Sequence, residues 1–264
     1  MISPVVSVDD LSAIPDAVLV DARHYLDGRS AEAAYREGHI PGAVFVSMDD
    51  VLANPPSPAA GRHPLPAPER FAAGMAAAGI SLDSTVVAYD DAGGAMAARI
   101  VWMLRLLGVD AALLDGGLAA WSEPLTTDVP TPTEGHFPAQ PWPEDALATI
   151  DELGGAVVID ARAPERYRGD LEPIDPVGGH IPGARNFPMT GNLASDGRFL
   201  EPEALRQRFH GLGEASDVIS SCGSGVTACH NLIAMEYAGL GRGRLYPGSW
   251  SQYSNSGRPI ATGD

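Results

Sequence analysis

The chain has 264 residues, of which 45% are hydrophobic, and a formal net charge of −17. This length and hydrophobic content suffice for two cores of ordinary domain size. The negative charge excludes nucleic acid and anionic membranes as charge-driven partners, and the absence of lysine excludes Schiff-base chemistry.

The predicted elements of the first half start with a strand at 18–20. A second apolar run predicts a strand at 86–89, and a helix is expected at 95–107. The stretch 122–143 is rich in proline, which breaks both helices and central strands. We expect this stretch to be a linker between two domains.

The second half repeats that order, with strands at 157–159 and 218–221 and a helix at 227–238. Alternating strands and helices are typical of an α/β fold, in which helices cover both faces of a parallel sheet. We therefore expect one such sheet in each half of the chain.

Four sequence landmarks occur twice and in the same order, which indicates two copies of one domain. They are 18–23 with 157–162, 38–43 with 179–184, 86–90 with 218–222, and 113–116 with 245–248. We predict a first domain at 1–121, a linker at 122–143 and a second domain at 144–264.

Cellular location and redox state follow from a few residues. No cation precedes Arg23, so the amino terminus lacks the charged region of a secretory signal. The apolar stretch 100–121 is interrupted by charged residues, which a membrane span would not tolerate. Cys222 and Cys229 cannot form a disulfide framework. We expect a cytoplasmic protein with free thiols.

Cys222 is the candidate nucleophile. It ends a predicted strand and begins a loop of small residues, Gly223, Ser224 and Gly225, before a helix. Glycines allow successive N–H groups to turn toward one point at the helix amino terminus, where they stabilise an anion. The alternative, a small buried hydrophobic residue, is the interpretation that we favour for Cys229.

The loop 222–228 resembles the active-site loop of the rhodanese superfamily of sulfurtransferases. Its uncharged Gly-Ser form is similar to the mercaptopyruvate branch, whereas the thiosulfate branch usually has basic residues there. The two Gly-His-Ile-Pro-Gly-Ala segments and the segment 246–250 extend the resemblance over nearly the whole chain. The resemblance implies tandem rhodanese-like domains and a persulfide on Cys222.

Donor recognition is expected from arginines and from the loop. The resemblance implies that Arg166 binds the anionic donor, with Arg162 and Arg168 as further candidates. Surface ion pairs are the alternative for Arg162 and Arg168. Mercaptopyruvate enzymes usually have a second arginine in a Glu-Pro-Arg segment, where this chain has 172–175, Glu-Pro-Ile-Asp. The loop candidates for donor binding are Gly223, Gly225, Val226 and Thr227.

A proton relay is a further implication of the resemblance. In mercaptopyruvate enzymes a loop serine is paired with a histidine and an aspartate from the first domain. Ser224 and His39 match the first two roles by motif, and no aspartate can be placed by spacing. His180 occupies the same motif in the second copy, so a structural hydrogen bond is the alternative for His39.

The first copy is predicted to be inactive. Asp90 stands where the second copy has Cys222, and a carboxylate cannot accept sulfane sulfur. Asp91 follows it, so we expect two negative charges at the position where an anion would bind.

The function expected from these residues is sulfur transfer from 3-mercaptopyruvate to cyanide or a thiol, including a thioredoxin-like acceptor, without metal or organic cofactor. Thiosulfate is the alternative donor. A phosphatase would need an arginine where Thr227 and Ala228 stand, and a non-catalytic persulfide carrier is the alternative outside the enzymes. Neither nucleic acid nor a membrane is expected as a partner.

Overall fold

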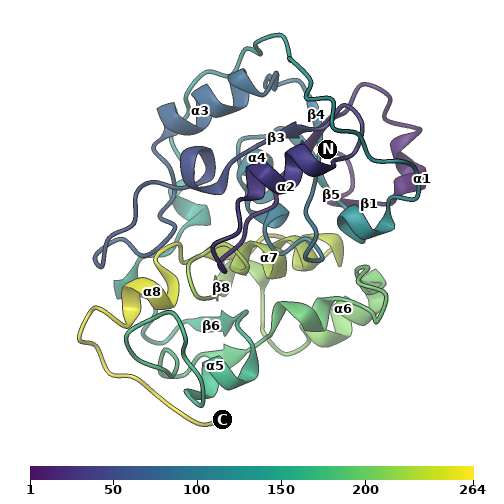
Figure 1. Cartoon of the computed structure of the whole chain (residues 1–264). Coiled ribbons are helices and arrows are strands. Elements are labelled where there is room, and N and C mark those ends of the chain that lie inside the picture. The colour runs from purple at the N-terminus through teal and green to yellow at the C-terminus, as the bar shows by residue number, and fades with distance from the viewer. The chain divides into compact units, whose positions relative to one another are not determined.

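The computed structural model describes residues 1–264, which form two compact units (Figure 1). Unit 1 consists of Met1–Asn54, Pro66–Trp142 and Ser195–Arg198. Unit 2 consists of Pro55–Leu65, Pro143–Ala194 and Phe199–Asp264. Unit 2 therefore includes a segment of the first repeat, Pro55–Leu65, which the expected boundaries place in the first domain.

Unit 1 is built on a five-stranded sheet in the order β1-β5-β4-β2-β3, and every pairing is parallel. The strands are β1 (Val5–Val6), β2 (Val18–Asp21), β3 (Val44–Phe45), β4 (Thr85–Tyr89) and β5 (Asp110–Leu114). The helices are α1 (Val8–Leu11), α2 (Ala31–Glu37), α3 (Pro68–Ala77) and α4 (Ala97–Leu106).

Both faces of this sheet are covered. Val87 and Tyr89 of β4 belong to an apolar cluster on one face, which includes Leu11 of α1. Neighbouring residues of a strand point to opposite faces, so Val86 and Ala88 face the other side, where α4 packs. Nine of the ten residues of α4 are buried, and most of them are apolar, as expected for a core helix.

Unit 2 is built on a four-stranded parallel sheet in the order β7-β6-β8-β9. The strands are β6 (Val157–Asp160), β7 (Arg185–Asn186), β8 (Val218–Ser221) and β9 (Arg244–Leu245). The helices are α5 (Pro164–Arg168), α6 (Pro202–Arg208), α7 (Ala228–Tyr237) and α8 (Ser249–Tyr253). Two parallel sheets with helices confirm the predicted α/β fold.

Helices also cover both faces of the second sheet. Ile219 of β8 lies in an apolar cluster with Tyr167 of α5 and Trp250 of α8. On the opposite face, the Ser220 hydroxyl donates to the carbonyl oxygen of Ala228 in α7 at 2.9 Å. α7 runs alongside β8 (Figure 1), so the amino end of a buried helix lies directly after the central strand.

The repeated Gly-His-Ile-Pro-Gly-Ala segment makes the same contact in each unit. Nδ1 of His39 lies 2.8 Å from the carbonyl oxygen of Tyr35, and the two rings stack. Nδ1 of His180 lies 2.9 Å from the carbonyl oxygen of Tyr167, and these rings also stack. Because both repeats have this contact, we infer that it stabilises the position of the Gly-His-Ile-Pro-Gly-Ala segment in each unit.

A buried ion pair follows the first long strand of each unit. Arg23 pairs with Asp21 at 2.7 Å, and Arg162 pairs with Asp160 at 2.7 Å. Each arginine also donates to the carbonyl oxygen that begins its Gly-His-Ile-Pro-Gly-Ala segment. The repeated Asp-Ala-Arg sequence is thereby explained by the fold.

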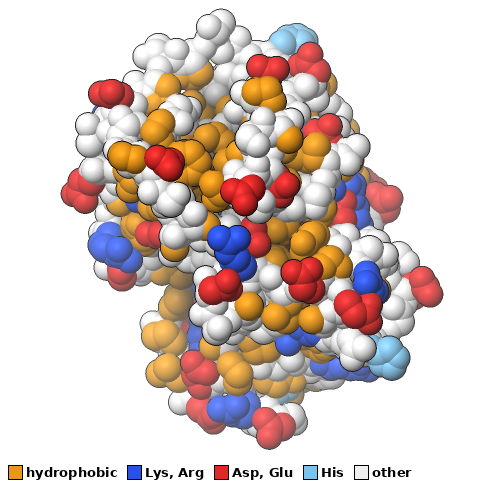
Figure 2. Space-filling view, turned by 90° about the vertical axis from the view of Figure 1, so that its right-hand side faces the viewer, with side chains coloured by type: hydrophobic (Ala, Val, Ile, Leu, Met, Phe, Trp, Pro, Cys, Tyr) orange, Lys and Arg blue, Asp and Glu red, His pale blue; other side chains and the backbone are white.

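The surface agrees with the acidic composition. On the face shown in Figure 2, acidic side chains are spread among apolar and uncharged ones, and no broad basic patch forms. None of the helices combines the length and the apolar character needed to cross a lipid bilayer.

Candidate functional site

Cys222 lies in unit 2 where a strand, a loop and a helix meet. It directly follows β8 and precedes the amino end of α7, and its side chain is 1% exposed. The backbone N–H of Gly225 donates to its Sγ at 3.1 Å. An N–H that points at the sulfur stabilises negative charge there, as a thiolate nucleophile requires.

The start of α8 fixes the backbone of Cys222. Its N–H donates to Oγ of Ser249 at 3.1 Å, and its carbonyl oxygen accepts from the N–H of Trp250 at 2.9 Å. Ser249 has a φ of 49°, which is uncommon for a residue with a side chain. This conformation is held by a second bond, from the Ser249 hydroxyl to the carbonyl oxygen of Tyr246 at 2.9 Å.

The loop requires glycine at position 225. Gly225 has a φ of 78°, and a Cβ atom there would lie 2.5 Å from the carbonyl oxygen of Pro247. A side chain would therefore push the loop away from the segment before α8. It is the backbone of Pro247 that approaches the loop, and nothing in the structure explains why this residue is proline.

The remaining loop residues join Cys222 to α7. Val226 is buried, and Thr227 stands at the amino-terminal cap position of α7 without a side-chain hydrogen bond of its own to the helix. Cys229 is buried inside α7, where its thiol donates to the carbonyl oxygen of Gly225 at 3.4 Å. A buried structural role, as expected from the sequence, fits these contacts of Cys229.

Ser224 is paired with a histidine that the sequence analysis missed. Nδ1 of His63 lies 2.8 Å from Oγ of Ser224, and both residues are buried. His63 comes from Pro55–Leu65, the part of the first repeat that belongs to unit 2. The pair therefore joins the loop of Cys222 to a segment far away in the sequence.

The structure corrects the assignment of His39. Its hydrogen bonds go to the carbonyl oxygens of Tyr35 and Asp128 in unit 1, so it serves the fold, and His63 is the histidine that contacts Ser224. A signal for this was present: the first repeat has 43 positions from Ala43 to Val86, whereas the second has 34 between the equivalent landmarks at 184 and 218. The longer stretch contains His63.

Two arginines and two carboxylates form a cluster beside the loop. Arg166 pairs with Glu172 at 2.6 Å, and Arg62 pairs with Asp175 at 2.8 Å. Both guanidinium groups approach Gly223. Burial by itself would raise the pKa of Glu172, but hydrogen bonds from Arg166 and from backbone N–H groups outweigh it and lower that pKa.

Arg162 and Arg168 form other contacts in the structure. Arg162 is held by Asp160 and stacks over the ring of Trp250, with 4.6 Å from guanidinium carbon to ring centre. Arg168 forms an exposed pair with Asp170 at 2.8 Å. Of the three predicted arginines, only Arg166 lies against the loop of Cys222.

The equivalent loop in unit 1 is occupied by its own side chain. Asp90 is fully buried, and its carboxylate accepts four backbone N–H bonds of 2.7–2.8 Å. Burial raises the pKa of Asp90, and the four N–H bonds oppose this effect. Asp91 is exposed and accepts from the Tyr25 hydroxyl. One carboxylate, and not two as expected, therefore occupies the anion position.

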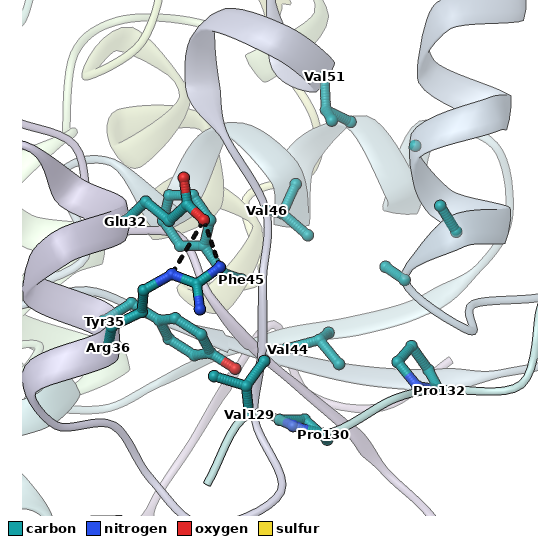
Figure 3. A pocket seen from close by; sticks show the side chains of 13 residues that line it. Glu32, Tyr35, Arg36, Val44, Phe45, Val46, Val51, Val129, Pro130 and Pro132 are labelled. Carbon is teal, nitrogen blue, oxygen red and sulfur yellow. Dashed lines mark hydrogen bonds and ion pairs between the residues drawn. The ribbon is translucent and has the colours of Figure 1, made fainter. Parts of the chain in front are cut away.

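Unit 1 does have a pocket, of about 290 Å³ (Figure 3). Its walls are mainly apolar and include Val44, Val46 and Pro130. The charged residues at its edge, Glu32 and Arg36, pair with each other at 2.8 Å. No cysteine lines this pocket.

Comparison with known proteins gives the same result for both repeats. A family model described as Rhodanese-like domain matches residues 6–124 and again residues 143–256. A protein of Pseudomonas aeruginosa, provisionally named 3-mercaptopyruvate sulfurtransferase, is 47% identical over 95% of this chain and 94% of its own length. A protein of Mycobacterium tuberculosis, provisionally named thiosulfate sulfurtransferase, is 40% identical over 93% of this chain and 90% of its own length.

A solved structure is similar over almost the whole chain. The 3-mercaptopyruvate sulfurtransferase from Leishmania major matches with a TM-score of 0.84 and 32% sequence identity. The match covers 97% of this chain and 75% of the Leishmania chain.

Proposed function

The chain belongs to the rhodanese family, and we propose that it transfers sulfur from 3-mercaptopyruvate to a thiol or cyanide through a persulfide on Cys222. The observation that carries this proposal is the hydrogen bond from the N–H of Gly225 to Sγ of Cys222. It marks the sulfur as the atom on which the loop stabilises negative charge.

The first step forms the persulfide. The Cys222 thiolate attacks the donor sulfur, and the bond between that sulfur and its carbon breaks. The electron pair of the broken bond stays on the carbon, which leaves as the enolate of pyruvate. The donor's thiol proton is transferred to this carbon, so the products are pyruvate and a Cys222 persulfide anion.

The second step releases the sulfur. A thiolate or cyanide attacks the outer sulfur of the persulfide, and the bond between the two sulfurs breaks. The electron pair returns to Cys222 as thiolate, and the acceptor leaves as a persulfide or as thiocyanate. Such an exchange follows ping-pong kinetics.

The Ser224 and His63 pair supports mercaptopyruvate as the donor. This donor needs a proton moved from sulfur to carbon, whereas thiosulfate releases sulfite and needs no such transfer. The Ser224 hydroxyl lies 2.8 Å from Nδ1 of His63, so a proton can be transferred between the two groups. Thiosulfate remains the second candidate because a relative in Mycobacterium tuberculosis is provisionally named for it.

We also propose a cellular compartment and sulfur acceptors for the chain. Cys222 and Cys229 are free thiols, which persist in the reducing cytoplasm. We assign the chain to that compartment, with small thiols, cyanide or a thioredoxin-like protein as acceptors. In this proposal the predicted second domain, 144–264, is catalytic and the first, 1–121, is inactive.

Steady-state transfer from mercaptopyruvate and from thiosulfate, measured in parallel, tests this function. Cys222→Ser is expected to be inactive with both donors. Ser224→Ala is expected to slow mercaptopyruvate turnover by about 10- to 100-fold and thiosulfate turnover much less. Cys229→Ser is the matched thiol control and retains activity. Persulfide loading of Cys222 without turnover would support a sulfur carrier, and failure to load would overturn the proposal.

A further inference from the structure

We propose that the loop 169–178 of unit 2 is a docking surface for a protein acceptor, a small protein that carries a reactive thiol on an apolar patch. This loop joins α5 to the second Gly-His-Ile-Pro-Gly-Ala segment. The inference rests on the proposed function and concerns its second step, in which an acceptor takes the sulfur from Cys222.

The loop belongs only to the repeat that carries the cysteine. In unit 1, α2 leads directly into the Gly-His-Ile-Pro-Gly-Ala segment, and Tyr35 contacts His39, four positions later. In unit 2, Tyr167 makes the same contact with His180, thirteen positions later. The extra residues form the loop, so it has no counterpart at this place in unit 1.

Hydrogen bonds hold the backbone of the loop in place. The indole N–H of Trp250 donates to the carbonyl oxygen of Val177 at 2.9 Å. Oε1 of Glu172 accepts from the backbone N–H groups of Ile174 and Asp175 at 3.0 and 3.1 Å. A surface that is already held in one conformation loses little conformational entropy when a partner binds to it.

The side chains of the loop reverse the usual arrangement, in which charged groups are exposed and apolar groups are buried. Leu171, Ile174 and Val177 are 54%, 42% and 45% exposed. The carboxylates of Glu172 and Asp175 are only 4% exposed, because each pairs with an arginine. Three of the eight large hydrophobic side chains that the chain exposes therefore lie within seven positions. Exposed apolar groups that cluster in this way mark interaction sites.

The loop also borders an opening beside the cysteine. An open hollow of about 300 Å³ lies between Ile174 and the segment Pro55–Leu65. Its wall includes Ser251, whose backbone N–H donates to the carbonyl oxygen of Gly223 at 2.9 Å. Because Gly223 directly follows Cys222, a partner seated on the loop lies next to the residues that carry the persulfide.

A protein thiol fits this surface better than other occupants do. Cyanide and small thiols need only the hollow and gain nothing from exposed aliphatic side chains. A second copy of the chain would cover the hollow and block the alternation of donor and acceptor that the two steps require. The net charge of −17 repels anionic thiolates and acidic proteins. A contact surface whose carboxylates are paired with arginines lowers that repulsion.

The chemistry at the surface is the second step of the proposed exchange. The thiolate of the partner attacks the outer sulfur of the Cys222 persulfide, and the bond between the two sulfurs breaks. Its electron pair returns to Cys222 as thiolate, and the partner leaves as a persulfide. Cyanide undergoes the same exchange without a protein contact, so it is the reference acceptor.

The test compares transfer from mercaptopyruvate to reduced thioredoxin, the probe for a protein thiol, with transfer to cyanide. A triple variant combines Leu171→Ser, Ile174→Ser and Val177→Ser. It is expected to raise the KM for thioredoxin by about 10- to 100-fold, because three apolar contacts are lost. Its kcat and KM for cyanide should stay within about twofold and its melting temperature within about 2 °C, since the three side chains are exposed.

Two matched variants control for general effects. Leu240 is exposed beyond the carboxyl end of α7, whereas Cys222 precedes the amino end of that helix. Leu240→Ser should therefore change the KM for neither acceptor by more than about twofold. Ile174→Leu keeps the apolar contact and should behave like the wild type, whereas Ile174→Ser alone should raise the KM for thioredoxin by about threefold or more.

An equal effect of the triple variant on both acceptors, or no effect on either, would overturn the docking surface and leave sulfur transfer intact. The same holds if the wild type transfers sulfur to cyanide and not to thioredoxin, or if sedimentation shows a dimer that the triple variant dissociates. If neither donor supports transfer, the proposed function fails. Titration of isotope-labelled reduced thioredoxin with Cys222→Ser, followed by NMR, needs no turnover and then decides. Weaker binding in the triple background supports the surface, and equal or absent binding overturns it.

Discussion

The loops at Asp90 in unit 1 and at Cys222 in unit 2 have the same backbone arrangement. They differ in the side chain that accepts hydrogen bonds from their backbone N–H groups, which we call the cradle. The carbonyl oxygen of Asp90 accepts from the N–H of Leu118 at 2.8 Å, and that of Cys222 accepts from the N–H of Trp250 at 2.9 Å. The glycine three residues later has a positive φ in both loops, 67° in unit 1 and 78° in unit 2.

The comparison shows that one loop conformation can hold a buried carboxylate in one unit and a thiol in the other. In unit 1 a carboxylate fills it permanently and uses four N–H groups. In unit 2 the N–H of Gly225 donates to the sulfur of Cys222. The outer sulfur of a persulfide is two bonds from Cβ, as the Asp90 carboxylate oxygens are. The unit 1 loop therefore resembles the state that we propose for the loaded enzyme.

The largest effect is expected when the loop of unit 2 receives the aspartate of the unit 1 loop. Cys222→Asp should lower sulfur transfer by about 10⁴-fold or more, because the nucleophile is lost. Its carboxylate can accept the loop N–H groups, so the melting temperature should equal or exceed that of Cys222→Ser. Scanning calorimetry and turnover assays measure both quantities. A melting temperature well below that of Cys222→Ser would show that the two cradles differ.

The next effect is expected from removing the carboxylate of Asp90 from the loop of unit 1. Asp90→Ala removes the acceptor of four buried N–H groups, and we expect unit 1 to lose about 2–4 kcal/mol of unfolding free energy. Asp91→Ala is the matched control, since Asp91 is exposed, and should change stability by less than about 0.5 kcal/mol. Urea unfolding measures the difference. Equal stabilities of the two variants would contradict a structural role for the Asp90 carboxylate.

The smallest effect concerns Gly225 in the loop of Cys222. Gly225→Ala and Gly211→Ala both place alanine at a positive φ, 78° and 83°, which costs about 1–2 kcal/mol. Only position 225 adds a clash, with the carbonyl oxygen of Pro247, whereas position 211 is open. We expect Gly225→Ala to be about 1–2 kcal/mol less stable than Gly211→Ala and to lose activity. Similar stability and full activity of both variants would show that the loop adapts.

The fold and the place of Cys222 in it could be predicted because their signals lie in continuous segments. The strand 218–221, Cys222, the glycines and the start of α7 are neighbours in the chain, so local geometry determines their arrangement. The repeat aligned Asp90 with Cys222 for the same reason, since both residues end a continuous landmark. It also offered the correct structural alternative for His39, since the equivalent His180 makes the same contact in unit 2.

The sequence by itself thus determined the two parallel sheets, the position of Cys222 at the end of a strand, and the aspartate at the equivalent position of the first repeat. Only the tertiary structure decided which residues meet this cysteine from elsewhere. His63 and Ser224 are 161 positions apart, and Arg62 and Asp175 are 113 positions apart. No period or spacing encodes such contacts, because they arise when Pro55–Leu65 packs beside α8 and brings its side chains to the loop.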